Sequence, residues 1–240
     1  MTVRLAIFDC DGTLVDSQAN IIECMAETFA KHRLDAPDRH AVRRVVGLSL
    51  AEAMAALLPG AEADFHDRLA EDYKLAFQSR RTNGGLAPQP LYPGVRGGLL
   101  QLERGGWLLG VATGKSDRGL ALTLLHHETH GRFVTRRAAD RHPPKPHPSM
   151  IQTAMAETGT RPEDTVMIGD RMDTDIIAGV NSGMETVLVL TGVTRAGEVD
   201  RFPYRPNAIV ESIAAVALPE AGSAGPSSAP AAGPHRQDNA

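Results

Sequence analysis

Residues 3–17 read Val-Arg-Leu-Ala-Ile-Phe-Asp-Cys-Asp-Gly-Thr-Leu-Val-Asp-Ser, and this stretch predicts the fold more strongly than any other part of the chain. The apolar run at 3–8 has the length and composition of a buried strand. It ends in Asp9 and Asp11, which lie on one side of the chain if the strand geometry continues. Gly12 then lets the backbone turn close to a ligand. Two acids crowded at a strand end require a cation, so the stretch predicts a metal-dependent site.

Further apolar, β-rich runs lie outward from this stretch and alternate with helical patterns. They occur at residues 107–112, 165–168 and 186–190, and each adjoins a helical stretch. Strands that alternate with helices predict an α/β fold with a doubly wound parallel sheet. In such a sheet the ligand binds beyond the carboxyl ends of the strands, near the point where the strand order reverses.

One segment, residues 18–89, breaks this alternation because it contains no convincing strand. Apolar residues recur there at helical spacing within 20–31, 39–46, 50–58 and 63–77. A stretch rich in proline begins at Pro88 and ends the pattern. We therefore expect an inserted all-helical unit at 18–89 and an α/β core made of residues 1–17 and 90–218.

Composition excludes several classes of protein. The chain has 240 residues, 42% of them hydrophobic, and a formal net charge of −4 without a basic stripe, so we do not expect nucleic acid as a ligand. Two cysteines favour a reduced compartment. The first apolar run is too short for a secretory signal or a membrane span, so we expect a cytoplasmic protein with no membrane partner. Nothing in the sequence indicates an oligomeric state.

The last 22 residues, 219–240, differ from the rest of the chain in composition. Sixteen of them are Ala, Gly, Pro or Ser, and none is a large apolar residue. Such a segment buries too little apolar surface to offset the entropy lost on ordering. We expect a disordered tail that takes no part in the chemistry.

The pattern Asp9-Cys-Asp11-Gly-Thr resembles the first signature of the haloacid dehalogenase superfamily, Asp-x-Asp-Gly-Thr. Three later stretches are similar to that superfamily's other signatures and follow in the same order: Thr113-Gly-Lys after a strand, Lys145-Pro-His-Pro at a helix start, and Gly-Asp170-Arg-Met-Asp173-Thr-Asp175 after another strand. The resemblance extends over about 210 residues and implies a Rossmann-like α/β core that hydrolyses phosphate esters.

The resemblance also implies a division of roles among the acids. Asp9 is the nucleophile that forms an aspartyl-phosphate, and Asp11 protonates the leaving oxygen and then deprotonates water. Mg²⁺ is bound by Asp9, the backbone carbonyl of Asp11 and Asp170. Asp175 lies five positions after Asp170. In the branch of the superfamily that has a helical lid, this acid usually lies four positions after. Asp175 is our first choice for the supporting carboxylate, and Asp173 is the alternative.

Phosphate-binding residues follow from the same resemblance: Gly12, Thr13, Thr113, Gly114, Lys115 and Lys145. For Lys115 two interpretations stay open, a contact with phosphate or substrate and a solvated lysine at a helix start. Asp11 favours phosphate esters over halogenated acids, because dehalogenases of the superfamily lack this second acid. A phosphomutase uses the same two acids and stays an alternative, as does a non-catalytic phospholigand-binding module.

The resemblance also implies a substrate-selecting lid, which the superfamily inserts either between the first and second signatures or between the second and third. Asp16 and Thr113 are 97 positions apart, whereas Thr113 and Lys145 are only 32 apart, so the lid is the helical segment 18–89. This arrangement resembles the phosphoglycolate phosphatase-like branch and implies a small phosphorylated metabolite as substrate. The C-terminal part, from Asp170 to Thr194, is closer to the nitrophenylphosphatase-like branch.

Two arginines of the lid, Arg43 and Arg44, offer a further hypothesis about the substrate. Each could bind a substrate carboxylate in bidentate fashion. An exposed position on a surface helix is the simpler interpretation of both.

Overall fold

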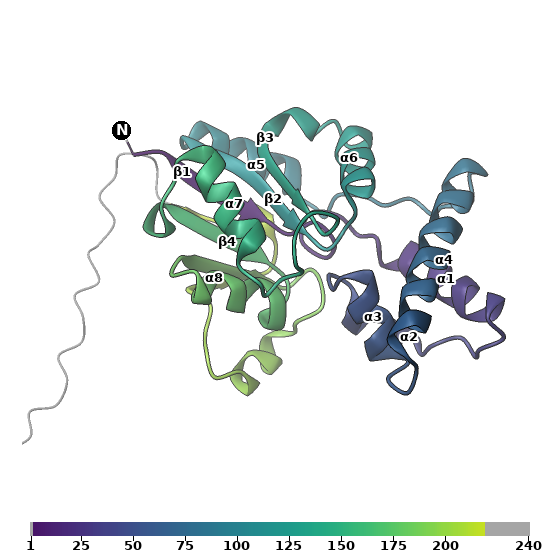
Figure 1. Cartoon of the computed structure of the whole chain (residues 1–240). Helices are drawn as coiled ribbons and strands as arrows, with labels where there is room; N and C mark the ends of the chain where they lie inside the picture. The colour runs from purple at the N-terminus through teal and green to yellow at the C-terminus, as the bar shows by residue number, and fades with distance from the viewer. Residues whose placement is uncertain (1, 219–240) are drawn as a thin grey trace, which may run out of the picture.

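A six-stranded sheet, in which all neighbouring strands run parallel, forms the centre of the fold (Figure 1). The computed structural model describes residues 2–218, so the expected disordered tail at 219–240 lies outside the described residues. The strand order is β3-β2-β1-β4-β5-β6. The strands are β1 (Arg4–Phe8), β2 (Trp107–Thr113), β3 (Phe133–Ala138), β4 (Thr165–Gly169), β5 (Glu185–Val189) and β6 (Ala208–Val210).

Helices cover both faces of the sheet because its central strands are apolar on both sides. Successive side chains of a strand point to opposite faces. In β1, Ala6 and Phe8 join a cluster that includes residues of α5 (Val95–Arg104) and α6 (Asp117–His126). Leu5 and Ile7 join a second cluster with residues of α7 (Ser149–Thr158) and α8 (Ile177–Asn181). The predicted α/β class with a doubly wound parallel sheet is confirmed.

The sequence pattern missed the strands β3 and β6, which lie at the two edges of the sheet. Strand β3 carries Arg136 and Arg137, and β6 has only three residues. An edge strand has one neighbour and need not be apolar on both faces, so it lacks the continuous apolar run that marks a central strand.

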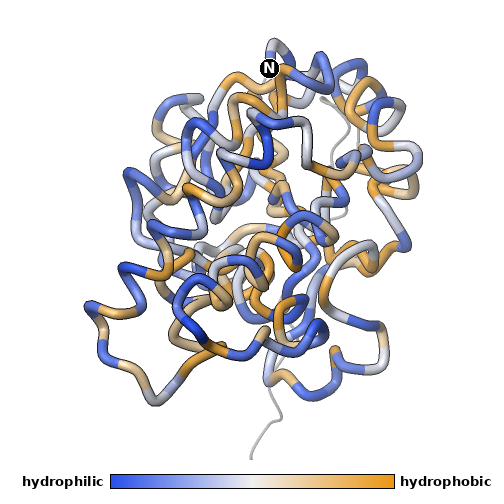
Figure 2. The backbone as a smooth tube through the Cα atoms, turned by 90° about the vertical axis from the view of Figure 1, so that its right-hand side faces the viewer, coloured by the Kyte–Doolittle hydropathy of each residue, from blue (hydrophilic) through white to orange (hydrophobic). Residues whose placement is uncertain are grey.

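Four helices form a separate cluster between β1 and α5. They are α1 (Gln18–Lys31), α2 (Arg39–Val45), α3 (Leu50–Leu57) and α4 (Ala63–Thr82). Their apolar faces enclose a core of their own, with Met25, Phe29 and Met54 fully buried. In Figure 1 these helices gather to the right of the sheet. Figure 2 shows that hydrophobic and hydrophilic residues alternate along the helices of the molecule.

Helix α4 is longer than its apolar pattern predicts and continues from Phe77 to Thr82. The added turn is polar, and ion pairs hold it: Arg80 contacts Glu23 at 2.6 Å and Glu27 at 2.8 Å, both on α1.

Within residues 2–218, no helix has the length and apolarity that a membrane crossing requires.

Short helical turns complete the chain. Turns of 3₁₀ type lie at His130–Arg132, Pro162–Asp164, Ala196–Arg201 and Ile213–Ala215, and a π-helical turn lies at Met172–Ile176.

Candidate active site

The carboxyl ends of three neighbouring strands bring the predicted site residues together. Asp9 follows β1, Thr113 ends β2 and Asp170 follows β4. Because β1 lies between β2 and β4, these residues meet at the point where the strand order reverses. The main-chain N–H of Asp9 donates to the carbonyl oxygen of Ile168 at 2.9 Å, which extends the pairing of β1 and β4 into the site.

Three buried carboxylates form a cluster at this edge of the sheet. Asp9, Asp170 and Asp175 each offer an oxygen atom, and these atoms lie within 4.8 Å of one another. All three residues are at most 1% exposed. Burial raises the pKa of Asp9 to about 6, against the opposing effect of Lys145 and with a further contribution from Asp175. Burial, together with the charge of Asp175, also raises the pKa of Asp170 well above its usual value.

Lys145 is the cation that the structure places against this cluster. Its Nζ donates to Asp9 Oδ1 at 2.8 Å, to Asp175 Oδ1 at 2.6 Å and to the carbonyl oxygen of Ala112 at 2.7 Å. Burial opposes its charge, but the carboxylates of Asp175 and Asp9 raise its pKa above the ordinary value. Lys145 therefore contacts two of the three carboxylates of the cluster.

The cluster fits a hard divalent cation. Asp9 Oδ2 is buried and has no hydrogen-bond partner among the described residues. An unpaired carboxylate oxygen in the interior is unfavourable unless a cation or a donor meets it. The oxygen-only donor set is the type that Mg²⁺ prefers.

Asp170 is held from two sides. Its Oδ1 accepts from the hydroxyl of Thr13 at 3.1 Å, and its Oδ2 accepts from the main-chain N–H of Val193 at 2.7 Å. Gly12 has a φ of +92°, and a Cβ atom there would lie 2.6 Å from Asp170 Oδ2. A side chain at Gly12 would thus displace this carboxylate. Thr13, expected at the phosphate, contacts Asp170 in the structure.

A π-helical turn brings Asp175 to the cluster despite its longer spacing from Asp170. Within Met172–Ile176 the chain makes wider turns, and the N–H of Ile177 donates to the carbonyl of Met172, five residues earlier. The wider turn accommodates the one additional residue between Asp170 and Asp175. Turns of the π type occur often at functional sites. The side chain of Asp173, the alternative acid, is 52% exposed and pairs with Arg171 at 2.6 Å.

Asp11 lies apart from the carboxylate cluster and has its own donors. Its Oδ1 accepts a hydrogen bond from the hydroxyl of Ser17 and pairs with Lys115 Nζ at 2.8 Å. The side chain of Lys115 is only 13% exposed, so its interpretation as a solvated lysine is wrong. Burial opposes the charge of Lys115, but Asp11 raises its pKa above the usual value.

The turn after β2 contacts the helical cluster directly. The main-chain N–H of Lys115 donates to the buried hydroxyl of Thr113 at 3.3 Å. A Cβ atom on Gly114 would lie 2.7 Å from the carbonyl oxygen of Gly47 and 2.8 Å from that of Leu48. Only glycine allows this approach of the loop between α2 and α3.

Sequence reasoning missed Arg171, which forms a second contact between the same loop and the core. Its side chain is buried, and its Nη1 donates to the carbonyl oxygens of Arg44 and of Val46, the latter at 2.7 Å. Its main-chain N–H donates to Asp175 Oδ2 at 3.1 Å. Its position directly after Asp170 was the only sequence feature that pointed to a role. The local sequence pattern cannot predict a contact between residues 125 positions apart.

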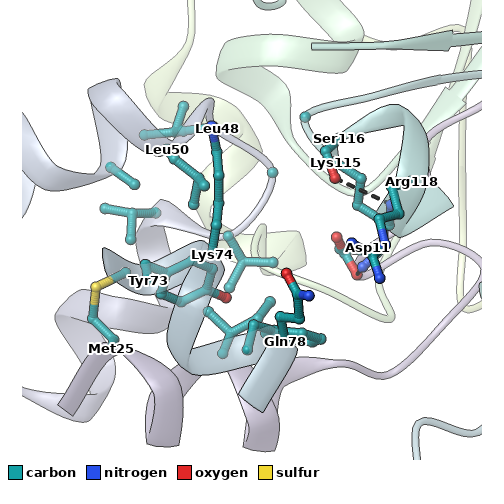
Figure 3. A pocket seen from close by; sticks show the side chains of 18 of the residues that line it. Asp11, Met25, Leu48, Leu50, Tyr73, Lys74, Gln78, Lys115, Ser116 and Arg118 are labelled. Atoms are coloured by element: carbon teal, nitrogen blue, oxygen red, sulfur yellow. Dashed lines mark hydrogen bonds and ion pairs between the residues drawn. The ribbon is translucent and has the colours of Figure 1, made fainter. Parts of the chain in front are cut away.

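A cavity of about 380 Å³ lies between the helical cluster and the core (Figure 3). Asp11 and Lys115 line it from the core side, and Met25, Leu48 and Tyr73 line it from the helices. The acid that is expected to protonate a leaving group therefore forms part of its wall.

Arg43 and Arg44 lie on the outer face of α2. Both residues are exposed, and neither lines this cavity. This placement favours the simpler surface-helix interpretation, because α2 turns Val42 and Val45 inward instead, and contact with a substrate carboxylate stays a hypothesis.

Comparison with known sequences finds the same family over most of the chain. A family model described as haloacid dehalogenase-like hydrolase matches residues 6–189. The chain is 30% identical over 215 residues to the probable phosphatase IndB of Dickeya dadantii (strain 3937), covering 88% of this chain and 91% of the relative. It is 47% identical over 73 residues to a dihydroxyacetone phosphatase of Corynebacterium glutamicum (strain R), which is 30% of this chain and 26% of the relative.

Solved structures show the same fold at lower identity. A haloacid dehalogenase-like family hydrolase from Streptococcus pneumoniae superimposes with a TM-score of 0.76 at 21% identity, covering 88% of this chain and 95% of that chain. A predicted phosphoglycolate phosphatase from Haemophilus somnus superimposes with a TM-score of 0.75 at 21% identity, covering 89% and 96%.

Proposed function

This chain belongs to the haloacid dehalogenase-like hydrolase family, and from that premise we propose that it is a Mg²⁺-dependent phosphatase that works through an aspartyl-phosphate. It is a phosphatase, and two relatives that match most of its length are named a probable phosphatase and a pyrophosphatase. One observation carries the proposal: Asp9, with one oxygen on Lys145 and the other unpartnered, lies within the carboxylate cluster and two residues from Asp11 on the cavity wall.

In the first step, a carboxylate oxygen of Asp9 attacks the phosphorus of the ester. The bond between phosphorus and the leaving oxygen breaks, and Asp11 transfers its proton to that oxygen. Ser17 and Lys115 both contact Oδ1 of Asp11, which leaves Oδ2 to carry the proton. The product alcohol then leaves through the cavity that Asp11 lines.

In the second step, the Asp11 carboxylate takes a proton from water as the water oxygen attacks the phosphorus. The bond between phosphorus and Asp9 breaks, and inorganic phosphate is released. Lys145 Nζ, 2.8 Å from Asp9 Oδ1, orients the nucleophile and offsets charge in both steps. Thr113, at the end of β2, together with Gly114 and Lys115, supplies donors to the phosphoryl oxygens. Gly12, also expected at the phosphate, donates its main-chain N–H to the carbonyl oxygen of Val15 at 3.0 Å instead.

Asp9, Asp170 and the backbone carbonyl of Asp11 would hold Mg²⁺, with Asp175 as the supporting acid. Bound there, the cation offsets the negative charge of the phosphoryl oxygens. Thr13 and Val193 fix the Asp170 carboxylate for this role, since each donates to one of its oxygens.

The helical segment 18–89 acts as a cap over a core of residues 1–17 and 90–218. Two contacts support this role, that of Gly114 with Gly47 and that of Arg171 with Val46. A closed cap excludes water from the cavity while the aspartyl-phosphate forms.

The substrate is a small phosphorylated metabolite of the phosphoglycolate type, a phosphomonoester of a hydroxy acid. The cap type and the likeness in fold to a predicted phosphoglycolate phosphatase support this assignment. The cavity of about 380 Å³ is within the usual size range of small-ligand sites.

Release of inorganic phosphate from a panel of phosphate esters with Mg²⁺ tests the proposal. We expect turnover of 4-nitrophenyl phosphate and of phosphoglycolate, and none by Asp9→Asn. Product analysis separates the alternatives: a phosphomutase returns an isomeric phosphate ester instead of free phosphate, and a binding module gives neither. No turnover of any ester would contradict the proposal.

A further inference from the structure

The charges around the cavity do not balance. Its charged lining residues are two acids and four bases: Asp11, Glu71, Lys74, Arg81, Lys115 and Arg118. Lys115 pairs with Asp11 at 2.8 Å, and Lys74 pairs with Glu71 at 2.7 Å. Within residues 2–218, neither Arg81 nor Arg118 pairs with a carboxylate. The cavity wall therefore carries two positive charges that no carboxylate of the described residues neutralises.

The two arginines come from opposite sides of the cavity. Arg81 lies near the end of α4, on the helix face that also presents Phe77 and Gln78 to the cavity, and Arg118 lies in the first turn of α6. The guanidinium of Arg81 lies over the Phe77 ring, 5.3 Å from its centroid. Burial and the charge of Arg118 both lower the pKa of Arg81, so the two cations repel each other. An anion between them would relieve this repulsion.

The cap side of the cavity is largely apolar. Figure 3 shows Met25, Leu48, Leu50 and Tyr73 opposite Asp11, Lys115 and Arg118. A surface of this kind is favourably covered by hydrocarbon and offers little to a hydroxyl-rich sugar.

We infer that the substrate is the phosphate ester of a hydroxy acid with an apolar body, whose second anionic group is bound by Arg81 and Arg118. Guanidinium groups suit this task because each can donate two parallel hydrogen bonds to a carboxylate. The apolar body fills the space against Tyr73 and Leu48. This inference rests on the proposed phosphatase function and specifies its leaving group.

The test compares esters that differ in one feature. Phosphorylated hydroxyhexanoate and phosphorylated hydroxyhexanamide have the same chain and the same leaving oxygen, but only the first has a distal charge. Phosphoglycolate keeps the carboxylate without the apolar body. We expect kcat/KM to favour the hexanoate ester over its amide by about tenfold, the value of one good charged hydrogen bond, and to favour it over phosphoglycolate.

Arg81→Gln and Arg118→Gln should each bring the ratio of acid to amide close to one. Arg80→Gln is the matched control: Arg80 directly precedes Arg81 in α4, but its guanidinium pairs with Glu23 and Glu27 and it does not line the cavity. We expect this variant to keep the ratio of the wild type. Circular dichroism checks that each variant is folded.

Calorimetric binding of both hexanoate compounds to Asp9→Asn repeats the comparison without turnover. Equal kcat/KM or equal affinity for acid and amide would overturn the anion site, and a preference for phosphoglycolate would overturn the apolar body. Absence of turnover with every ester would instead contradict the phosphatase proposal, while the calorimetry would still decide the anion site.

Discussion

Nη1 of Arg171 lies 2.7 Å from the carbonyl oxygen of Val46, and so a residue beside the carboxylate cluster holds the loop between α2 and α3. The main-chain N–H of the same arginine donates to Asp175 in the carboxylate cluster. Arg171 therefore contacts both this loop and an acid of the carboxylate cluster.

Arg171→Met should loosen the cap. The change removes the donor to the carbonyls of Arg44 and Val46, and hydrogen bonds from charged donors contribute about 1.5–3 kcal/mol. We expect faster amide exchange in α2 and a KM raised by about tenfold, because the closed state is less populated. Arg43→Met, at an exposed position of the same helix, is the control. Unchanged exchange in α2 would show that Arg171 does not hold the cap.

Asp175→Asn and Asp173→Asn separate the two candidate acids. We expect Asp175→Asn to raise the Mg²⁺ concentration for half-maximal activity by about 10–100-fold, the usual effect of losing a group that orients metal ligands. Asp173→Asn should leave it close to the wild-type value, since this side chain is half-exposed and pairs with Arg171. A larger effect of Asp173→Asn than of Asp175→Asn would contradict the assignment.

Stabilisation by Mg²⁺ should depend on pH. Burial raises the pKa of Asp9 to about 6 from 3.8, so the folded, metal-free protein binds a proton more tightly than the unfolded chain does. Its free energy of unfolding therefore rises as the pH falls from about 7 to about 4. Protons and Mg²⁺ compete for the same carboxylates. The difference in Tm with and without Mg²⁺ should shrink below about pH 6, and a constant difference from pH 8 to 5 would be inconsistent with this cation site.

Lys145→Met should destabilise the metal-free protein. The ammonium contacts Asp9 and Asp175, and losing one partner of a buried ion pair costs about 3–5 kcal/mol. Urea unfolding in the presence of a chelator measures the change. The double variant with Asp175→Asn should recover part of the loss, since it removes one of the two stranded charges. Additive effects of the two substitutions would mean that these groups do not interact.

The strands that carry the site could be predicted because they are central. β1 and β4 are buried on both faces and read as continuous apolar runs that end in Asp9 and Asp170. Their parallel pairing makes the carboxyl ends meet, and the clustering of these acids follows from topology alone. The edge strand β3 was not predicted, because its arginines interrupt the apolar pattern.

Contacts between the cap and the core could not be predicted. Arg171 and Val46 lie 125 positions apart, and no local periodicity relates them. The choice between Asp173 and Asp175 also depended on a π-helical turn, because in a regular α-helix a side chain five positions on lies well around the helix axis. The lack of a carboxylate partner for Arg81 and Arg118 among the described residues depends on tertiary contacts, which the sequence pattern does not give.

The central claim, that Asp9 is the phosphoryl acceptor, is tested most directly by trapping its adduct. In Asp11→Asn the base for the second step is missing, whereas 4-nitrophenolate leaves without a proton, so the aspartyl-phosphate should accumulate. Acid quenching, proteolysis and mass spectrometry should find the phosphoryl group on the peptide that contains Asp9, and specifically on Asp9. A phosphoryl group on any other residue, or phosphate release by Asp9→Asn at the wild-type rate, would contradict the account.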